Sequence, residues 1–196
     1  KPALGVGAGN VPAYVEKSAN IRQAAHDIVM SKSFDNGMVC ASEQAVIIDK
    51  EVYDEFVEEF KSYHTYFVNK KEKALLEEFC FGAKANSKNC AGAKLNPDIV
   101  GKPATWIAEQ AGFSVPEDTN ILAAECKEVG EKEPLTREKL SPVIAVLKSE
   151  SREDGVEKAR QMVEFHGLGH SAAIHTADEE LTKEFGKAVR AIRVIC

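Results

Sequence analysis

Residues 143–147 read Val-Ile-Ala-Val-Leu, an unbroken apolar run without polar residues at alternate positions. Such a run is typical of a strand that is buried on both faces of a sheet. Ser151 follows as the N-cap of a predicted helix, with Val156 and Val163 on its inner face. Residues 171–175, Ser-Ala-Ala-Ile-His, form the next predicted strand. Continuous apolar strands that alternate with helices favour a parallel sheet with both faces covered.

The same alternation continues outward in both directions. Short apolar runs predict further strands over 45–48, 121–124 and 192–196. Helical periodicity predicts further helices over 21–29, after an Asn20 N-cap, and over 52–60, 71–81, 103–112 and 178–189. Loops are predicted over 5–12, 31–39 and 82–102, and a charged connector over 127–139. We therefore predict a three-layer α/β/α fold around a mostly parallel, twisted sheet.

The composition is that of a globular protein with its own core. The chain has 196 residues, of which 44% are hydrophobic and 29% charged. Twenty-five basic residues face 31 acidic ones, and the net charge of −6 argues against a nucleic-acid partner. No apolar run is long enough to span a membrane, and no signal peptide is visible. The five scattered cysteines, which form no C-x-x-C pair, favour a reducing cytoplasm.

The two ends of the sequence suggest that it is a piece of a longer protein. The first residues, Lys1-Pro2, include no initiator Met, and the last, Arg193 to Cys196, form an apolar run with strand character. A natural domain seldom stops inside a strand. We therefore expect further domains in the full-length polypeptide.

Cys40 is the first candidate for chemistry, because a turn at Asn36-Gly37 precedes it and a predicted strand follows. A thiol on such a loop can meet a ligand. The residue pattern alone nevertheless favours a small buried hydrophobic side chain, the commoner fate of a single cysteine. Gly5, Gly7 and Gly9 lack the spacing and the following helix of a dinucleotide-binding loop. We interpret these glycines as a permissive loop that lines the site.

Several separate motifs, in one order, resemble the aldehyde dehydrogenase superfamily. Residues 34–44, Phe-Asp-Asn-Gly-Met-Val-Cys-Ala-Ser-Glu-Gln, are similar to its active-site cysteine segment, and residues 5–10, 103–112, 138–143 and 167–170 agree with further motifs. The resemblance is strongest to the CoA-acylating branch, in particular to the aldehyde dehydrogenase half of bifunctional aldehyde–alcohol dehydrogenases. It implies that residues 1–196 are the cysteine-bearing catalytic domain, without the cofactor-binding domain and without any alcohol dehydrogenase domain.

By this resemblance Cys40 is the nucleophile that attacks a short aldehyde such as acetaldehyde. Hydride then passes to NAD, a thioester remains on Cys40, and coenzyme A takes the acyl group as acetyl-CoA. The backbone N–H of Cys40 is a candidate oxyanion donor. Hydrolytic members carry a glutamate in the segment that matches residues 4–10, which here has no carboxylate. Met38 also replaces the glutamine of the broader pattern, so the acylating branch is favoured.

Glu138 and His170 complete the candidate site. Glu138 resembles the glutamate that accepts hydrogen bonds from the ribose next to the nicotinamide, although composition alone favours an exposed glutamate in a charged connector. His170, after Gly167 and Gly169, matches an active-site histidine that activates the CoA thiol or holds the intermediate. The alternative is a loop histidine that only hydrogen bonds the backbone. The other histidines and cysteines are interpreted as structural or surface residues, and no spacing suggests a metal site.

Other functions stay open at this stage. A hydrolytic or semialdehyde dehydrogenase, or an acyl-phosphate reductase, would belong to the same superfamily. An interaction or filament-forming domain with a vestigial site is a different class, and a Cys–His hydrolase is a weaker one, because no Asn or Asp orienter is evident. The resemblance implies a homo-oligomer or filament for the full-length protein, and we expect the isolated chain to be poorly active.

Overall fold

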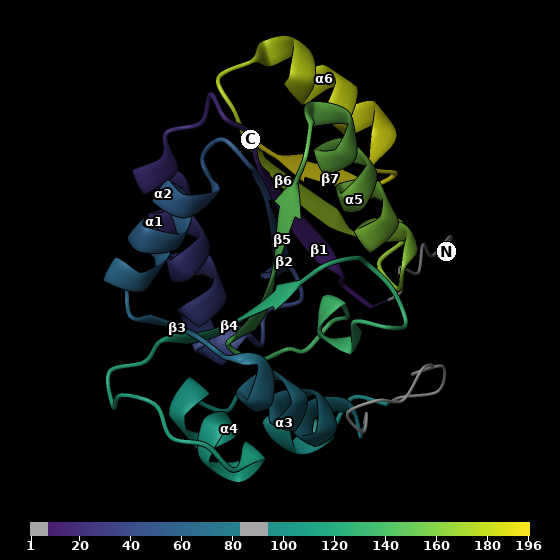
Figure 1. Ribbon diagram of the computed structural model, residues 1–196. Helices are drawn as coiled ribbons and strands as arrows, with labels where there is room; N and C mark the ends of the chain where they lie inside the picture. Colours follow the sequence, from purple (N-terminus) through teal and green to yellow (C-terminus); the bar gives the residue numbers. More distant parts are fainter. Residues whose placement is uncertain (1–7, 83–93) are drawn as a thin grey trace, which may run out of the picture.

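The apolar runs become the strands of one sheet in the computed structural model, which describes residues 8–82 and 94–196 (Figure 1). The described residues form seven strands, all parallel, in the order β3-β4-β5-β2-β1-β6-β7. Their bounds are β1 Val11–Val15, β2 Glu43–Asp49, β3 Thr65–Phe67, β4 Ile121–Cys126, β5 Val143–Ser149, β6 Ser171–His175 and β7 Arg193–Ile195. The predicted parallel α/β fold is therefore confirmed.

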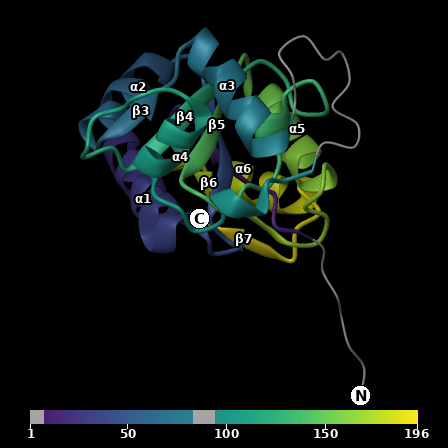
Figure 2. The same cartoon turned by 90° about the horizontal axis from the view of Figure 1, so that it is seen from below.

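Helices cover both faces of this sheet, as predicted. They are α1 Ile21–Ser33, α2 Tyr53–Ser62, α3 Lys70–Phe81, α4 Ala104–Ala111, α5 Arg152–Glu164 and α6 Glu179–Ala188. Helices α1 and α2 lie on one side of the sheet and α5 on the other, which is clearest in the view from below (Figure 2). Alternate residues of β2 divide accordingly: Val46 and Ile48 join the core under α1 and α2, and Ala45 and Ile47 join the core on the opposite face.

Short polar side chains begin the helices where the sequence predicted caps. Asn20 accepts a hydrogen bond from the Gln23 N–H, Ser151 from the Asp154 N–H, and Asp178 from the N–H groups of Glu180 and Leu181. Each bond satisfies a backbone donor that the first helical turn leaves without a partner.

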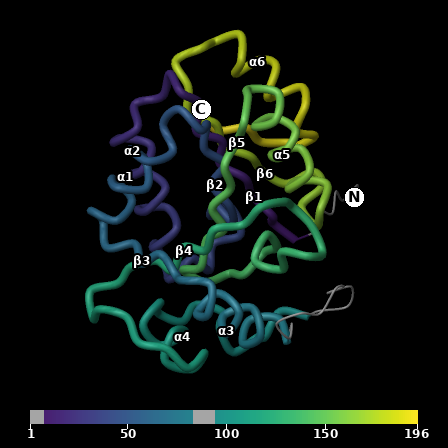
Figure 3. The backbone as a smooth tube through the Cα atoms, in the orientation of Figure 1, coloured from purple at the N-terminus to yellow at the C-terminus, as the bar shows by residue number. Residues whose placement is uncertain are grey.

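Two predicted boundaries are wrong, and the sequence predicted no strand at β1 or β3. The loop expected over 5–12 ends earlier, because Val11 and Pro12 belong to β1, a strand that lies between β2 and β6 (Figure 3). Pro12 is tolerated there because the register to β2 shifts beside it and the pairing with β6 begins only at Ala13. Strand β3 has only three residues, too few for a periodic signal. Helix α1 extends to Ser33, beyond its predicted end, and Phe34–Gly37 follow as a tight turn in which Asp35 and Asn36 have non-helical backbone angles.

A close approach between α5 and β1 gives a first testable prediction. A Cβ on Gly155 would lie 2.4 Å from two ring atoms of Tyr14, a fully buried residue whose hydroxyl donates to Asp49 Oδ1 at 2.8 Å. Gly155→Ala should therefore lower the free energy of unfolding by about 1–3 kcal/mol through overpacking. Gly186→Ala on the exposed side of α6, where a Cβ meets no atom within 4 Å, should raise it by about 0.5–1 kcal/mol.

Urea unfolding measures the free energy of unfolding of both variants. Each replaces a helical glycine by alanine, so the gain in helix propensity is the same and the difference between them reports the packing against Tyr14. Equal stability of Gly155→Ala and the unsubstituted chain would contradict the close packing of α5 on the Tyr14 ring.

Candidate active site

The three predicted site residues meet at the edge of the sheet where strands begin. Cys40 precedes β2, Glu138 precedes β5 and His170 precedes β6. Because all strands are parallel, their amino ends share one edge, and the order β5-β2-β1-β6 makes these strands close neighbours. Gly9 precedes β1 and so enters between them. Topology thus brings together residues that are far apart in the sequence, such as Gly9 and His170.

Gly9 is the point at which these residues converge. Its N–H donates a hydrogen bond of 2.7 Å to Glu138 Oε1. A Cβ at this position would lie only 2.2 Å from the Cys40 carbonyl oxygen and 3.1 Å from Cε1 of the His170 ring. The absence of a side chain at Gly9 is therefore what allows the Cys40 loop, the His170 ring and the Glu138 carboxylate to share one site.

The loop that carries Cys40 has an unusual backbone. Asp35, Asn36 and Gly37 all have left-handed conformations, with φ values of 49°, 50° and 69°. A Cβ on Gly37 would also lie 2.6 Å from the Ser141 carbonyl oxygen. This position therefore requires glycine for two reasons, its left-handed backbone and the lack of space for a side chain. Left-handed residues other than glycine carry backbone strain, which is common beside functional sites. The loop is thus held in a fixed shape against the segment that follows Glu138.

Cys40 itself is an exposed, free thiol, so the interpretation as a small buried hydrophobic residue is wrong. Within the described part of the chain, no group accepts a hydrogen bond from the Cys40 backbone N–H. That N–H is available to a ligand oxygen.

The other cysteines differ from Cys40 in their surroundings. Cys80 and Cys126 are buried, and burial raises the pKa of each thiol to about 12. Cys196 is exposed at the far end of β7, and Cys90 lies outside the described residues.

Glu138 is half-buried and bonded to Gly9, which differs from the exposed connector glutamate that composition favoured. The next residue, Lys139, is fully buried, and sequence reasoning missed it. Its ammonium group donates to three carbonyl oxygens, those of Gln44 at 3.0 Å, Leu135 at 2.6 Å and Arg137 at 2.7 Å. Its backbone N–H donates to Gln44 Oε1 at 3.0 Å. This cradle ties the Glu138 segment to the first residues of β2.

A second buried lysine shares the same acceptor. Lys32 Nζ donates to Gln44 Oε1 at 3.3 Å, and Gln44 Nε2 donates to the Ser42 carbonyl oxygen at 3.1 Å. Gln44 therefore connects the end of α1, the Cys40 loop and the Glu138 segment. Burial lowers the pKa of Lys139 to about 7 and that of Lys32 well below its ordinary value, to which the charge of Lys139 contributes.

The His170 ring lies beside Gly9, and its Nδ1 is buried without a hydrogen-bond partner among the residues that the structure describes. Its backbone N–H donates to Gly167 O at 3.1 Å. The alternative of a loop histidine that only hydrogen bonds the backbone thus explains the main chain of His170, but not the position of its ring. A buried ring nitrogen without a partner is a group that a ligand or water can satisfy.

Asn10 is a further residue that sequence reasoning missed. It is buried, and its Nδ2 donates to the carbonyl oxygens of Thr136 at 2.9 Å, Met162 at 3.0 Å and Phe165 at 2.8 Å. It joins the Glu138 connector to the end of α5, next to the loop that carries His170. No metal-binding group of three His, Cys, Asp or Glu side chains is found within residues 8–82 and 94–196.

The lowered pKa of Lys139 predicts a dependence of stability on pH. Between the folded value of about 7 and the ordinary value of 10.5, the unfolded chain binds a proton that the folded chain does not. Stability from this group should therefore rise with pH across that window, by up to about 1.4 kcal/mol per pH unit, and change no further below it. Lys139→Met should reduce this slope as well as the stability itself, because three buried carbonyl oxygens lose their donor.

Urea unfolding at pH values of about 7, 8 and 9 measures the slope. Lys187→Met, which replaces an exposed lysine of α6, is the matched control and should retain the slope of the unsubstituted chain. An unchanged slope in Lys139→Met would contradict the prediction.

Comparison with known proteins gives a consistent result. Residues 3–196 match the model of the aldehyde dehydrogenase family. An aldehyde-alcohol dehydrogenase of Streptococcus pneumoniae serotype 4 is 94% identical over 196 residues, which are 100% of this chain and 22% of that protein. The chain thus spans about a fifth of the length of this curated relative. No helix of the described residues is long and apolar enough to cross a membrane.

Two solved structures share the fold. An acetylating aldehyde dehydrogenase from Geobacillus thermoglucosidasius is 40% identical with a TM-score of 0.90, and the match covers 100% of this chain and 41% of that one. A propionaldehyde dehydrogenase of Rhodopseudomonas palustris, solved with bound CoA and an acylated cysteine, is 27% identical with a TM-score of 0.83, covering 100% of this chain and 42% of that one.

Proposed function

The chain belongs to the aldehyde dehydrogenase family, and on this premise we propose that it is the catalytic domain of a CoA-acylating aldehyde dehydrogenase that interconverts acetaldehyde and acetyl-CoA. The observation that carries the proposal is the convergence at Gly9 of an exposed thiol loop, a carboxylate and an imidazole ring. The names of the acetylating relatives support the same reaction class.

Cys40 is the nucleophile in this proposal. Its thiolate attacks the aldehyde carbon and forms a carbon–sulfur bond, while the carbonyl oxygen becomes an oxyanion that the Cys40 N–H stabilises. Oxidation of this adduct leaves a thioester on Cys40. The thiol of CoA then attacks the thioester carbon, and the bond to Cys40 breaks to restore the thiolate. In this proposal His170, whose ring lies at the same site, takes the proton from the CoA thiol or holds the intermediate.

Glu138 would hold the nicotinamide cofactor through the hydroxyl groups of its ribose. The fit is supported by the carboxylate itself: Oε1 is bonded to Gly9, while Oε2 accepts no hydrogen bond from any described residue and is available to a hydroxyl. NAD, when bound, supplies the acceptor for the hydride. We propose that the rest of its site lies in a cofactor-binding domain elsewhere in the full-length polypeptide, which forms a homo-oligomer or filament.

Acyl transfer to CoA is favoured over hydrolysis because the segment 4–10 contains no carboxylate that could activate water. The acylated cysteine and bound CoA of the Rhodopseudomonas palustris structure support the same order of events in a relative.

The proposal is tested by intact-mass spectrometry after incubation of the chain with acetyl-CoA, a half-reaction that needs no nicotinamide. We expect one acetyl group, located on Cys40 by peptide mapping, removed by free CoA and absent from Cys40→Ala. Cys196→Ala, the other exposed free cysteine, is the control and should label normally. The same incubation with the full-length protein shows whether a second domain is required. Failure of both proteins to label at Cys40 would refute the acylating function.

A further inference from the structure

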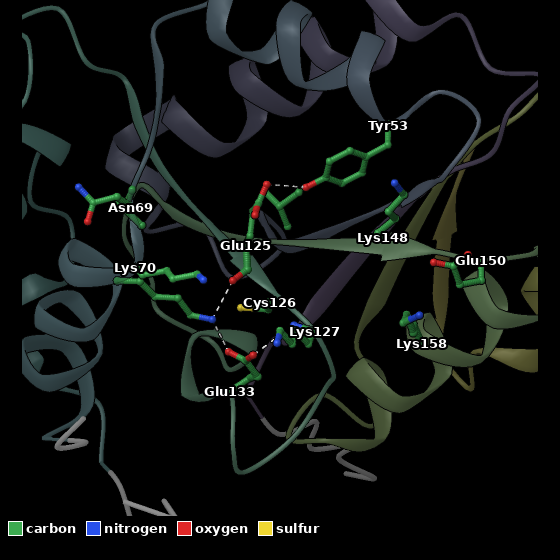
Figure 4. Close-up of a pocket in the computed structure, with 13 residues that line it drawn as sticks. Tyr53, Asn69, Lys70, Glu125, Cys126, Lys127, Glu133, Lys148, Glu150 and Lys158 are labelled. Carbon is green, nitrogen blue, oxygen red and sulfur yellow. Dashed lines mark hydrogen bonds and ion pairs between the residues drawn. The ribbon is translucent and has the colours of Figure 1, made fainter. Parts of the chain in front are cut away.

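A pocket of about 780 Å³ opens at the sheet edge opposite to Cys40 (Figure 4). It is lined by residues that end or follow three neighbouring strands: Val68 and Asn69 after β3, Cys126 and Lys127 at and after the end of β4, and Lys148 as the second-to-last residue of β5. Cys40, Glu138 and His170 all precede strands. The candidate active site and this pocket therefore lie at opposite ends of the strands. The carboxyl edge of an open parallel sheet is the usual position for ligands in this class of fold.

The floor of this pocket is apolar and its volume is that of a small-molecule site. Val68, Val146, the buried Cys126 and the ring of Tyr53 form its apolar surface. Ligand pockets typically measure roughly 300–1,000 Å³ and combine such a floor with a few convergent polar groups. The pocket is thus large enough for a molecule that carries a flat ring as well as a charged group.

Charged side chains of the pocket are held in place by the protein's own contacts. Lys73 is ion-paired with Glu133 and donates to the Glu125 carbonyl oxygen at 2.7 Å. The remaining Glu133 oxygen accepts the Lys127 backbone N–H at 3.1 Å, and the Tyr53 hydroxyl donates to Glu125 Oε1 at 3.0 Å. Figure 4 shows these contacts as dashed lines. The carboxylates of Glu125 and Glu133 thus already have partners within the protein.

Three ammonium groups are left over for a ligand. The ammonium groups of Lys70, Lys127 and Lys148 form no ion pair with any residue in the two described ranges. Lys148 instead lies 5.0 Å from the centre of the Tyr53 ring. Glu150 is paired with Lys50 outside the pocket. Among the described acidic residues that line the pocket, only Glu125 has no ion pair with a cation. The opening is therefore basic on a chain whose net charge is −6.

We propose that this pocket binds a phosphorylated small molecule, with the phosphate attracted by the unpaired ammonium groups of Lys70, Lys127 and Lys148 and an apolar group against Tyr53 and Val146. Lysine binds phosphate as a point charge and needs no fixed hydrogen-bond fork. The three lysines come from separate segments of the chain and line one pocket, so they are not the solvated face of a single helix. Lys148 lies beside Tyr53, apart from Lys70 and Lys127 (Figure 4). This site is independent of Cys40 and of the function proposed for it.

Isothermal titration of the chain with AMP and with inorganic phosphate tests the proposal. One AMP should bind per chain, more tightly than phosphate, because only AMP places a ring on the apolar floor. In the variant Lys127→Glu/Lys148→Glu, the association constant should fall at least about tenfold. The variant Lys183→Glu/Lys187→Glu changes the net charge equally on exposed positions of α6 and should stay within about twofold.

Two results would overturn the proposal: no saturable binding of AMP, or an equal loss of affinity in both charge-reversed variants, which would indicate a general charge effect. Citrate separates phosphate from carboxylate chemistry, and binding of citrate as tight as that of AMP would also contradict it. If the double reversal alters the thermal unfolding transition, Lys127→Ala/Lys148→Ala replaces it and should still weaken AMP binding at least about fivefold.

Discussion

Under the proposed function, replacement of Cys40 by alanine in the full-length protein should reduce the rate of CoA-dependent acetaldehyde oxidation by roughly 10³-fold or more. A methyl group cannot form the thiohemiacetal or the thioester, so every step that needs a covalent intermediate is lost. Because Cys40 is exposed, the substitution leaves no cavity in the core and should change the thermal unfolding temperature little. The rate is followed as NADH formation at saturating aldehyde and CoA.

The matched control is Cys196→Ala, which removes the other exposed thiol at the end of β7 and should keep full activity. Retention of a substantial part of the rate in Cys40→Ala would show that another group carries the acyl intermediate. Cys80 and Cys126 are poor substitutes, because burial keeps their thiols protonated.

Gly9→Ala should have the second-largest effect, although it removes no functional group. The new Cβ would lie 2.2 Å from the Cys40 carbonyl oxygen, which is shorter than any tolerable contact. Either the Cys40 loop or Gly9 must therefore move, and a movement of Gly9 would also displace its hydrogen bond to Glu138. A displacement of about 1 Å at a reacting centre can cost roughly 10²-fold in rate, which is the loss we expect for Cys40 acetylation by acetyl-CoA.

The cause of this loss is steric, because Gly9 is not one of the glycines with a positive φ. Gly186→Ala serves as the control for the chemical change itself, since its Cβ meets no atom within 4 Å. Rapid-quench mass spectrometry measures the acetylation rate of each variant. A Gly9→Ala chain that acetylates at the rate of Gly186→Ala would contradict the placement of Gly9 between Cys40, His170 and Glu138.

Local signals were sufficient for most of the secondary structure. The runs at 121–124 and 143–147 became central strands because continuous apolar sequence can be buried only where both faces of a sheet are covered. Asn20 and Ser151 became caps because their short side chains reach backbone donors a few residues ahead. Strand β1 was missed because Pro12 argues locally for a loop, and only its pairing partners show that the ladder tolerates it.

The candidate site was harder to predict from the sequence than the secondary structure. Residue patterns alone favoured a buried Cys40 and an exposed Glu138, and only the likeness to a known family selected them. Gly9 was expected in a permissive loop that lines the site, but its exact contacts, like the importance of Lys139, have no local signal in the sequence. Gly9 matters because the carboxylate of Glu138, 129 positions away, accepts a hydrogen bond from its N–H. Lys139 matters because its ammonium group donates to the carbonyl oxygen of Gln44, 95 positions away.

Which chemical groups are present follows from the amino-acid sequence: a thiol after an Asn-Gly turn, a glutamate before Ser-Pro-Val, and a histidine after two glycines. Their helices and strands also follow from it, because hydrophobic periodicity and capping act over a few residues. Whether these groups share one site depends on the strand order β5-β2-β1-β6, which is set by burial across the whole sheet. The same long-range order sends five lysines to the opposite edge, where no local pattern unites them.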